Sequence, residues 1–108
     1  MTLNDYQTVA MQTAVFPTHG DMPIIYPALG LAGETGEVVD KIKKVVRQGE
    51  FTVESNDAIA RELGDVLWYI AVLADGLGFA LADIAAMNLH KLSDRQSRGV
   101  LKSEGDNR

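Results

Sequence analysis

The sequence predicts an all-α fold: one four-helix bundle-like domain that is completed by oligomerisation. Apolar residues recur at helical spacing along most of the 108 residues, and no stretch shows the strict alternation of a half-buried strand. All three prolines fall within residues 17–27, which predicts a loop there. We assign residues 1–96 to the helical domain and expect residues 97–108 to form a polar, flexible tail. A chain of this length builds only a thin core, which a partner subunit can complete.

Four helices are expected, at about residues 3–16, 27–48, 56–77 and 81–95. Thr2 or Asn4 is the expected N-cap of the first helix, and Ser55 or Asn56 that of the third. Gly49 provides a stop after the second helix, because glycine accepts the left-handed conformation with which helices commonly end.

Composition and charge argue against several classes of protein. The net charge is −5, with ten Lys plus Arg against fifteen Asp plus Glu, whereas nucleic-acid binders usually carry a basic surface. No run of about 18 apolar residues is present to span a membrane. The chain has no cysteine, and its first residues lack the basic segment of a signal peptide. We therefore expect a cytoplasmic protein that binds neither nucleic acid nor membrane.

Two acidic pairs, Glu34-x-x-Glu37 and Glu62-x-x-Asp65, lie on the second and third predicted helices. At about 100° per residue, each pair borders the apolar stripe of its helix instead of lying opposite to it. Residues three apart are neighbours on a helix surface, so two such pairs on facing helices can bring four carboxylates together. Carboxylates placed there need a cation, because leaving them partly buried and unpaired is costly.

The expected cation is Mg²⁺, with Mn²⁺ as a substitute, because both prefer oxygen ligands. Mg²⁺ usually takes its remaining ligands from water and from substrate phosphates, so the implied substrate carries phosphates. A structural alternative stays open at this point: acidic pairs at this spacing are common on solvated helix faces, and Lys41 could neutralise Glu34 or Glu37 directly.

The fourth helix carries polar residues that predict phosphate contacts. Asn88, Lys91 and Arg95 flank its apolar stripe. The alternative is a set of solvated charges near a helix C-terminus, where the helix dipole favours Lys and Arg.

The third helix predicts self-association. From Val66 to Ala74 it is apolar all round except for a tyrosine hydroxyl, and such a helix is normally buried on every side. Because a four-helix monomer cannot easily cover it, we expect a homodimer or a homotetramer, with Trp68 at or near the interface.

Three runs, ALGLAGETGEVVDKIKK, ELGDVLWYIAVLADGLG and NLHKLSDR, carry a family resemblance. Together they resemble the MazG-like nucleotide pyrophosphohydrolases of the all-α NTP pyrophosphatase superfamily, over residues 26–95. The resemblance implies a four-helix core that forms dimers or tetramers, dependence on Mg²⁺, and hydrolysis of a nucleoside triphosphate between its α and β phosphates.

Carried over by position, the resemblance also implies roles for single residues. The implied metal ligands and catalytic residues are Glu34, Glu37, Glu62 and Asp65, and the implied substrate-binding residues are Lys91, Arg95, Asn88, Lys41, Lys44 and Tyr69. Tyr69 either packs against a nucleotide base or is an ordinary core tyrosine. Many relatives have a further glutamate just before Glu34, where this chain has Gly33, so the number of metal ions stays open.

The resulting functional hypothesis is a Mg²⁺-dependent hydrolase that converts a (d)NTP to a (d)NMP and pyrophosphate, in the cleansing of nucleotide pools. Two alternatives stay open. One is a related enzyme specific for phosphoribosyl-ATP, dUTP or dCTP, and the other is a non-enzymatic helical module for dimerisation or regulation.

Overall fold

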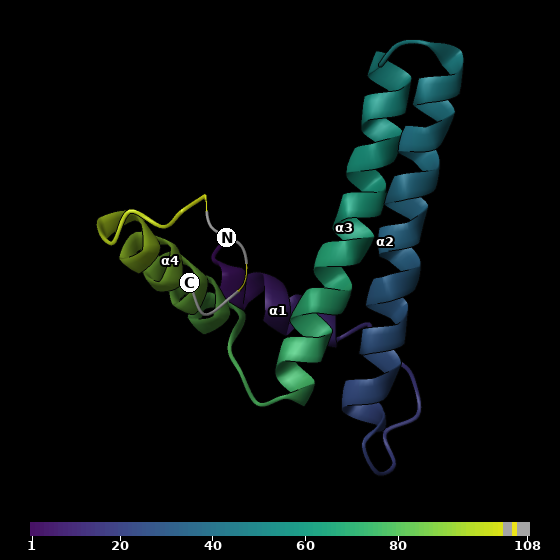
Figure 1. Cartoon of the computed structure of the whole chain (residues 1–108). Helices are drawn as coiled ribbons and strands as arrows, with labels where there is room; N and C mark the ends of the chain where they lie inside the picture. The colour runs from purple at the N-terminus through teal and green to yellow at the C-terminus, as the bar shows by residue number, and fades with distance from the viewer. Residues whose placement is uncertain (103–104, 106–108) are drawn as a thin grey trace.

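The computed structural model describes residues 1–102 and 105, which contain four α-helices and no strand (Figure 1). The helices are α1 (Leu3–Met11), α2 (Met22–Gln48), α3 (Val53–Gly76) and α4 (Leu81–Ser97). The predicted all-α fold class is therefore confirmed.

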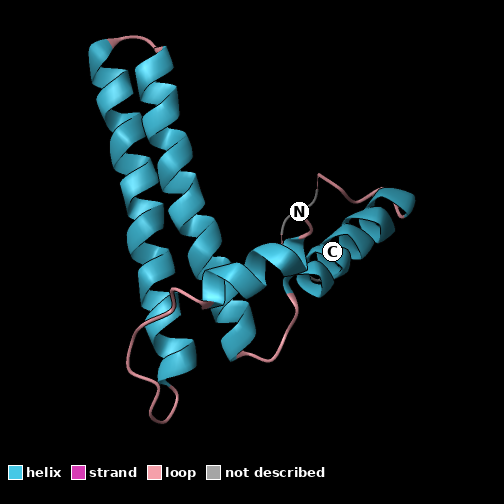
Figure 2. Ribbon diagram, turned by 180° about the vertical axis from the view of Figure 1, so that it is seen from behind, coloured by secondary structure: helices cyan, strands magenta, loops and turns pink. Residues whose placement is uncertain are grey.

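The two long helices, α2 and α3, form an antiparallel hairpin that dominates the packing of the chain (Figures 1 and 2). Two glycines allow their close approach. A Cβ atom at Gly30 would overlap the ring of Tyr69, and one at Gly76 would overlap the carbonyl group of Pro23. Any larger residue at either glycine would push the helices apart, so these two contacts fix the register of the hairpin.

Helix α1 is tied to α3 and α4 by one buried glutamine, Gln7. Its Nε2 donates to the carbonyl oxygens of Ala71 and Phe79, both at 3.1 Å. Its Oε1 accepts a hydrogen bond of 2.9 Å from the N–H of Leu81, at the start of α4. Ala10, Ala71 and Leu81 form the buried apolar cluster beside it. Gln7 thus satisfies three backbone groups where α1, α3 and α4 meet.

Helix α4 lies outside the hairpin. It packs against α1 and α3, and within the described residues it makes no contact with α2 (Figure 1). The radius of gyration is 16.6 Å, whereas a compact domain of this length has about 13 Å. The accessible surface is 7606 Å², against about 5,900 Å² for a typical folded monomer of this mass. A single chain is therefore more extended and more exposed than a compact monomer.

The chain bends by 99° between α3 and α4. Among the described residues no single helix is long and apolar enough to cross a membrane, and α3 and α4 satisfy that criterion of length and composition only as this bent pair.

The predicted start of the second helix is wrong. Helix α2 begins at Met22, inside the segment predicted to be a loop. Pro23 occupies the first turn, where the missing N–H is not needed. Pro27 lies inside the helix and removes only the hydrogen bond that would reach the carbonyl of Pro23. That carbonyl is the group that faces Gly76, so the tertiary contact accommodates both prolines.

Two further boundaries differ from the prediction. Helix α3 is capped by Thr52, because its Oγ1 accepts from the N–H of Ser55 while the Ser55 Oγ accepts from the N–H of Thr52. Helix α1 ends at Met11 instead of residue 16, and the Thr13 hydroxyl donates to the carbonyl of Ala10. The Thr52 hydroxyl thus supplies a partner for an N–H group at the start of α3, and the Thr13 hydroxyl bonds a carbonyl at the end of α1.

The expected cap of α1 and the expected stop of α2 are confirmed. Thr2 caps α1, and Gly49 ends α2 with a φ of 98°. Helix α4 extends through Ser97, past its expected end. The predicted tail, residues 97–108, falls partly outside the described residues, which omit 103–104 and 106–108.

We expect Gln7→Leu to lower the free energy of unfolding by roughly 2–4 kcal/mol, because the carbonyl of Phe79 and the N–H of Leu81 lose their hydrogen-bond partner. Urea unfolding at fixed protein concentration measures the change. Gln12→Leu, at the exposed end of the same helix, is the control and should change stability little. Equal stability of Gln7→Leu and the wild type would show that Gln7 does not hold α1 in place.

Candidate functional site

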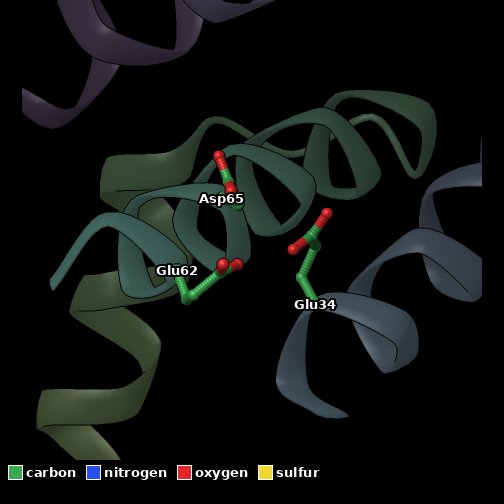
Figure 3. A group of neighbouring side chains, drawn as sticks. All are labelled: Glu34, Glu62 and Asp65. Atoms are coloured by element: carbon green, nitrogen blue, oxygen red, sulfur yellow. The ribbon is translucent and has the colours of Figure 1, made fainter. Parts of the chain in front are cut away.

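Three of the four predicted metal ligands meet between the hairpin helices. Glu34 of α2 and Glu62 and Asp65 of α3 each offer one carboxylate oxygen, and these three oxygens lie within 4.8 Å of one another. Figure 3 shows Glu34 reaching from its helix toward the two acidic residues of the facing helix. We call these three side chains the carboxylate group. The register that sets Gly30 against Tyr69 brings Glu34 level with Asp65.

The carboxylate group is an electrostatically strained arrangement. Glu34 and Glu62 are half-buried, while Asp65 is exposed. Loss of solvation raises the pKa of Glu34, and so do a hydrogen bond with Glu62 and repulsion by Asp65, Glu62 and Glu37. The surroundings thus make ionisation of Glu34 less favourable than that of a free glutamate, with a raised pKa as the result.

One lysine offsets part of this charge. Lys41 of α2 places its Nζ 3.4 Å from Oε1 of Glu62 on α3. Among the ion pairs between described residues, this is the one that joins two helices, since the others link residues three or four apart on one helix. A single ammonium beside three carboxylates leaves the group net negative when all three are ionised.

The carboxylate group fits a hard divalent cation. Its donors are all oxygens, as Mg²⁺ and Mn²⁺ prefer, and no cysteine is available in the chain to favour a softer metal. Metal–oxygen bonds of about 2.1 Å allow ligand oxygens to lie up to about 4.2 Å apart. The spread of 4.8 Å therefore needs only a small inward movement of the side chains.

Glu37 differs from the other three predicted ligands. It lies one turn after Glu34, is exposed, and is not part of the carboxylate group. Its charge still reaches the site, because it contributes to the raised pKa of Glu34. Its role as a ligand stays a prediction.

Tyrosines border the carboxylate group. The pKa of Tyr69 is raised by burial and then by the proximity of Tyr26, Glu34 and Asp65. Burial and the charge of Asp65 also raise the pKa of Tyr6, which comes from α1. The sequence indicated Tyr69 alone. Tyr6 is brought in by the packing of α1, for which the sequence carries no local signal.

The ring of Tyr26 is itself held in place. It stacks on Phe16 with ring centroids 4.8 Å apart and an interplanar angle of 7°. Helical periodicity did not indicate Tyr26, because this residue falls in the segment that was predicted to be a loop and that the structure shows as the beginning of α2.

Within the described residues α4 does not contact α2, the helix that carries Glu34, although it does contact α3. Asn88 and Lys91 line a separate cavity of about 310 Å³ together with Ile84 and Met87. Arg95 is only 3% exposed and so packs inside the chain. Their roles in substrate binding stay predictions.

The two lysines of α2 line another cavity. Lys41 and Lys44 lie on its wall, between α2 and the beginning of α3, and the cavity has a volume of about 290 Å³. Glu54 and Ser55 contribute from α3. Lys41 therefore adjoins both this cavity and the carboxylate group.

Comparisons with known proteins identify the family of the chain. Residues 27–100 match the MazG nucleotide pyrophosphohydrolase domain family, so the chain belongs to that family. The chain is also 43% identical to the Gene 37 protein of Mycobacterium phage L5, over an alignment of 114 residues that covers 100% of both sequences. No solved structure matches. The family places the chain among the nucleotide pyrophosphohydrolases, and the all-oxygen carboxylate group accords with a divalent metal in that family.

The raised pKa of Glu34 predicts how stability depends on pH. The folded protein holds the Glu34 proton more tightly than the unfolded chain, whose glutamate pKa is near 4.5. Without metal, the free energy of unfolding should therefore fall as pH rises from about 4.5 through the higher folded pKa. Glu34→Gln removes this charge, so in EDTA at pH 7 we expect the variant to have the higher melting temperature, with the difference shrinking at pH 4.

Thermal unfolding followed by circular dichroism measures this effect. Glu50→Gln, in the exposed connection between α2 and α3, is the control and should show no such pH-dependent difference in melting temperature. Adding Mg²⁺ should stabilise the wild type more than Glu34→Gln. A wild type that is the more stable protein in EDTA at pH 7 would contradict the prediction.

Proposed function

We propose that this protein is a Mg²⁺-dependent nucleoside triphosphate pyrophosphohydrolase that converts a (d)NTP to a (d)NMP and pyrophosphate. The observation that carries the proposal is the convergence of Glu34, Glu62 and Asp65 in a chain of the MazG family. Cleaving a phosphoanhydride needs positive charge beside the phosphates and a positioned water. The proposed setting is the cytoplasm, where the enzyme cleanses nucleotide pools.

The side chains divide the work of the reaction. Glu34, Glu62 and Asp65 would hold the metal ion, which supplies positive charge at the phosphate oxygens and makes water more acidic. A glutamate of α2, either Glu34 or Glu37, accepts the proton of the attacking water. Hydrolysis then breaks the bond between the α phosphorus and the bridging oxygen, and pyrophosphate leaves.

Base binding is proposed for the tyrosines that border the carboxylate group. Tyr69 packs against Gly30 at the site, and Tyr26 is stacked and 41% exposed. Aromatic rings stack on any nucleobase, so they support binding without choosing a base. Phosphoribosyl-ATP, dUTP and dCTP therefore remain candidate substrates beside a broader range of triphosphates.

We further propose that the working unit is a homodimer or a homotetramer. The accessible surface of one chain exceeds that of a typical monomer of this mass by about 1,700 Å². Large apolar side chains contribute to the excess, among them Leu29, Val46 and Leu89, which are 69%, 75% and 67% exposed. The partner does not need to cover all of Trp68, because its Nε1 already donates to Thr13 Oγ1 at 2.9 Å.

Oligomerisation also offers a role for α4. In one chain Asn88 and Lys91 line a cavity to which none of the three carboxylates contributes, and within the described residues α4 does not contact α2. In the proposed assembly a second copy brings these two residues to the phosphates. Arg95, being buried, contributes to phosphate binding only if the assembly exposes it.

Replacing Asp65 tests the chemistry. Asp65→Asn removes a carboxylate from the group, so we expect Mg²⁺-dependent pyrophosphate release to fall by about 100-fold or more with helix content unchanged. We expect the same loss for Glu37→Gln. A panel of canonical, deoxy and modified triphosphates, scored for pyrophosphate and orthophosphate, measures activity and preference.

Asp57→Asn provides the matched control for that assay. Asp57 lies on the same helix as Asp65 but pairs with Arg61 at 3.0 Å, away from the carboxylate group. It should retain wild-type turnover. Full activity of Asp65→Asn would contradict the metal-site assignment. Orthophosphate as the first product would contradict cleavage between the α and β phosphates. No turnover by the wild type on any triphosphate would favour a non-enzymatic helical module.

The assembly is tested by mass. Light scattering at micromolar concentration should give two or four times the chain mass of 11.7 kDa. Leu29→Glu should reduce this mass because it places a charge on the exposed apolar surface. A wild-type mass equal to one chain would contradict the proposed assembly.

A further inference from the structure

Lys41 joins two features of the hairpin that otherwise lie apart. Its Nζ is 3.4 Å from Oε1 of Glu62, and the side chain of Lys41 is 30% exposed while that of Glu62 is 17% exposed. The same lysine lines the cavity near the tip of the hairpin, together with Lys44. It therefore adjoins the carboxylate group on one side and this cavity on the other.

The ion pair cannot persist unchanged when Glu62 becomes a metal ligand. A divalent cation on the carboxylate group would lie a few ångströms from the Lys41 ammonium, and like charges at that separation repel. The carboxylate would also have less negative charge to share with the lysine. Lys41 would then turn away from Glu62 and toward the cavity that it already lines.

We propose that Lys41 couples metal binding to phosphate binding: it is the internal counter-ion of Glu62 in the metal-free protein, and it becomes a ligand of the substrate phosphates only after Glu62 has taken a metal ion. This inference rests on the proposed function. It adds an order of binding: the metal ion binds before the triphosphate, and Lys41 is the residue that enforces this order.

The two other charged residues on the cavity wall, Lys44 and Glu54, do not pair with Glu62. Lys44 pairs with Asp40 at 3.0 Å, four residues away on its own helix, so its position does not depend on Glu62. Glu54 adds a negative charge and would disfavour phosphate until Lys41 is released. The linkage is reciprocal, so phosphate binding must strengthen metal binding through the same lysine.

The test uses inorganic pyrophosphate as the probe and needs no metal and no turnover. Glu62→Gln and Asp65→Asn each remove one carboxylate charge from the same group, but only Glu62→Gln removes the partner of Lys41. By calorimetry in EDTA, at constant ionic strength, we expect Glu62→Gln to bind pyrophosphate at least about five-fold more tightly than Asp65→Asn.

Second substitutions identify the lysine that is responsible. Adding Lys41→Met to Glu62→Gln should abolish the gain, whereas adding Lys44→Met should leave most of it. Equal affinities of Glu62→Gln and Asp65→Asn, or a gain that survives Lys41→Met, would overturn the proposal. Circular dichroism verifies that each variant keeps its helix content.

A measurement on the wild type covers the case in which a variant does not fold. Modification of lysine amines by an acylating reagent, followed by mass spectrometry, reports the accessibility of each Nζ. Adding Mn²⁺ should increase the modification of Lys41 several-fold and leave that of Lys44 nearly unchanged. Unchanged reactivity of Lys41 with bound Mn²⁺ would refute the release of this lysine.

The outcome separates this inference from the proposed function. Metal-dependent pyrophosphate release by the wild type, together with equal pyrophosphate affinities of the two variants, would leave the enzyme standing and remove the role of Lys41. A Lys41-dependent gain in a protein that hydrolyses no triphosphate would support the linkage and remove the proposed activity.

Discussion

The close contact between α2 and α3 is the constraint on which the rest of the structure depends. Gly30 admits the ring of Tyr69, and Gly76 admits the carbonyl of Pro23. In an antiparallel hairpin two such contacts fix the register of every other pair, and that register sets Glu34 level with Asp65. The positions of the carboxylates are thus decided by contacts elsewhere along the hairpin, because helices move against one another as rigid bodies and not residue by residue.

Charge and packing oppose each other at this site. Packing brings Glu34, Glu62 and Asp65 within reach of one cation, although their mutual repulsion and partial burial disfavour the ionised state. Lys41 relieves part of that repulsion by pairing with Glu62. A site built in this way is less stable empty than loaded, which is the condition under which ligand binding stabilises a fold by mass action. The same lysine also borders the nearby cavity, which is why we propose a second position for it.

The sequence predicted the helical fold class and the acidic pairs because both depend on local periodicity. It misplaced the start of α2, since the cost of Pro27 inside a helix depends on what faces the carbonyl of Pro23. It also gave no sign of Gln7, whose hydrogen bonds reach residues more than 60 positions away. Tyr6 joins the site for the same reason, through packing between α1 and α3. Long-range contacts of this kind leave no trace in the spacing of neighbouring residues.

By itself the sequence determined which residues lie on one face of each helix, because the helical repeat is set by backbone geometry alone. It therefore determined that Glu34 and Glu37, and Glu62 and Asp65, are neighbours in pairs. Only the tertiary structure decided that Glu34 joins the second pair while Glu37 stays exposed, and that α4 lies away from α2. Those outcomes depend on how the helices pack and where the chain turns. Both are decided by many contacts between residues that are far apart in the sequence.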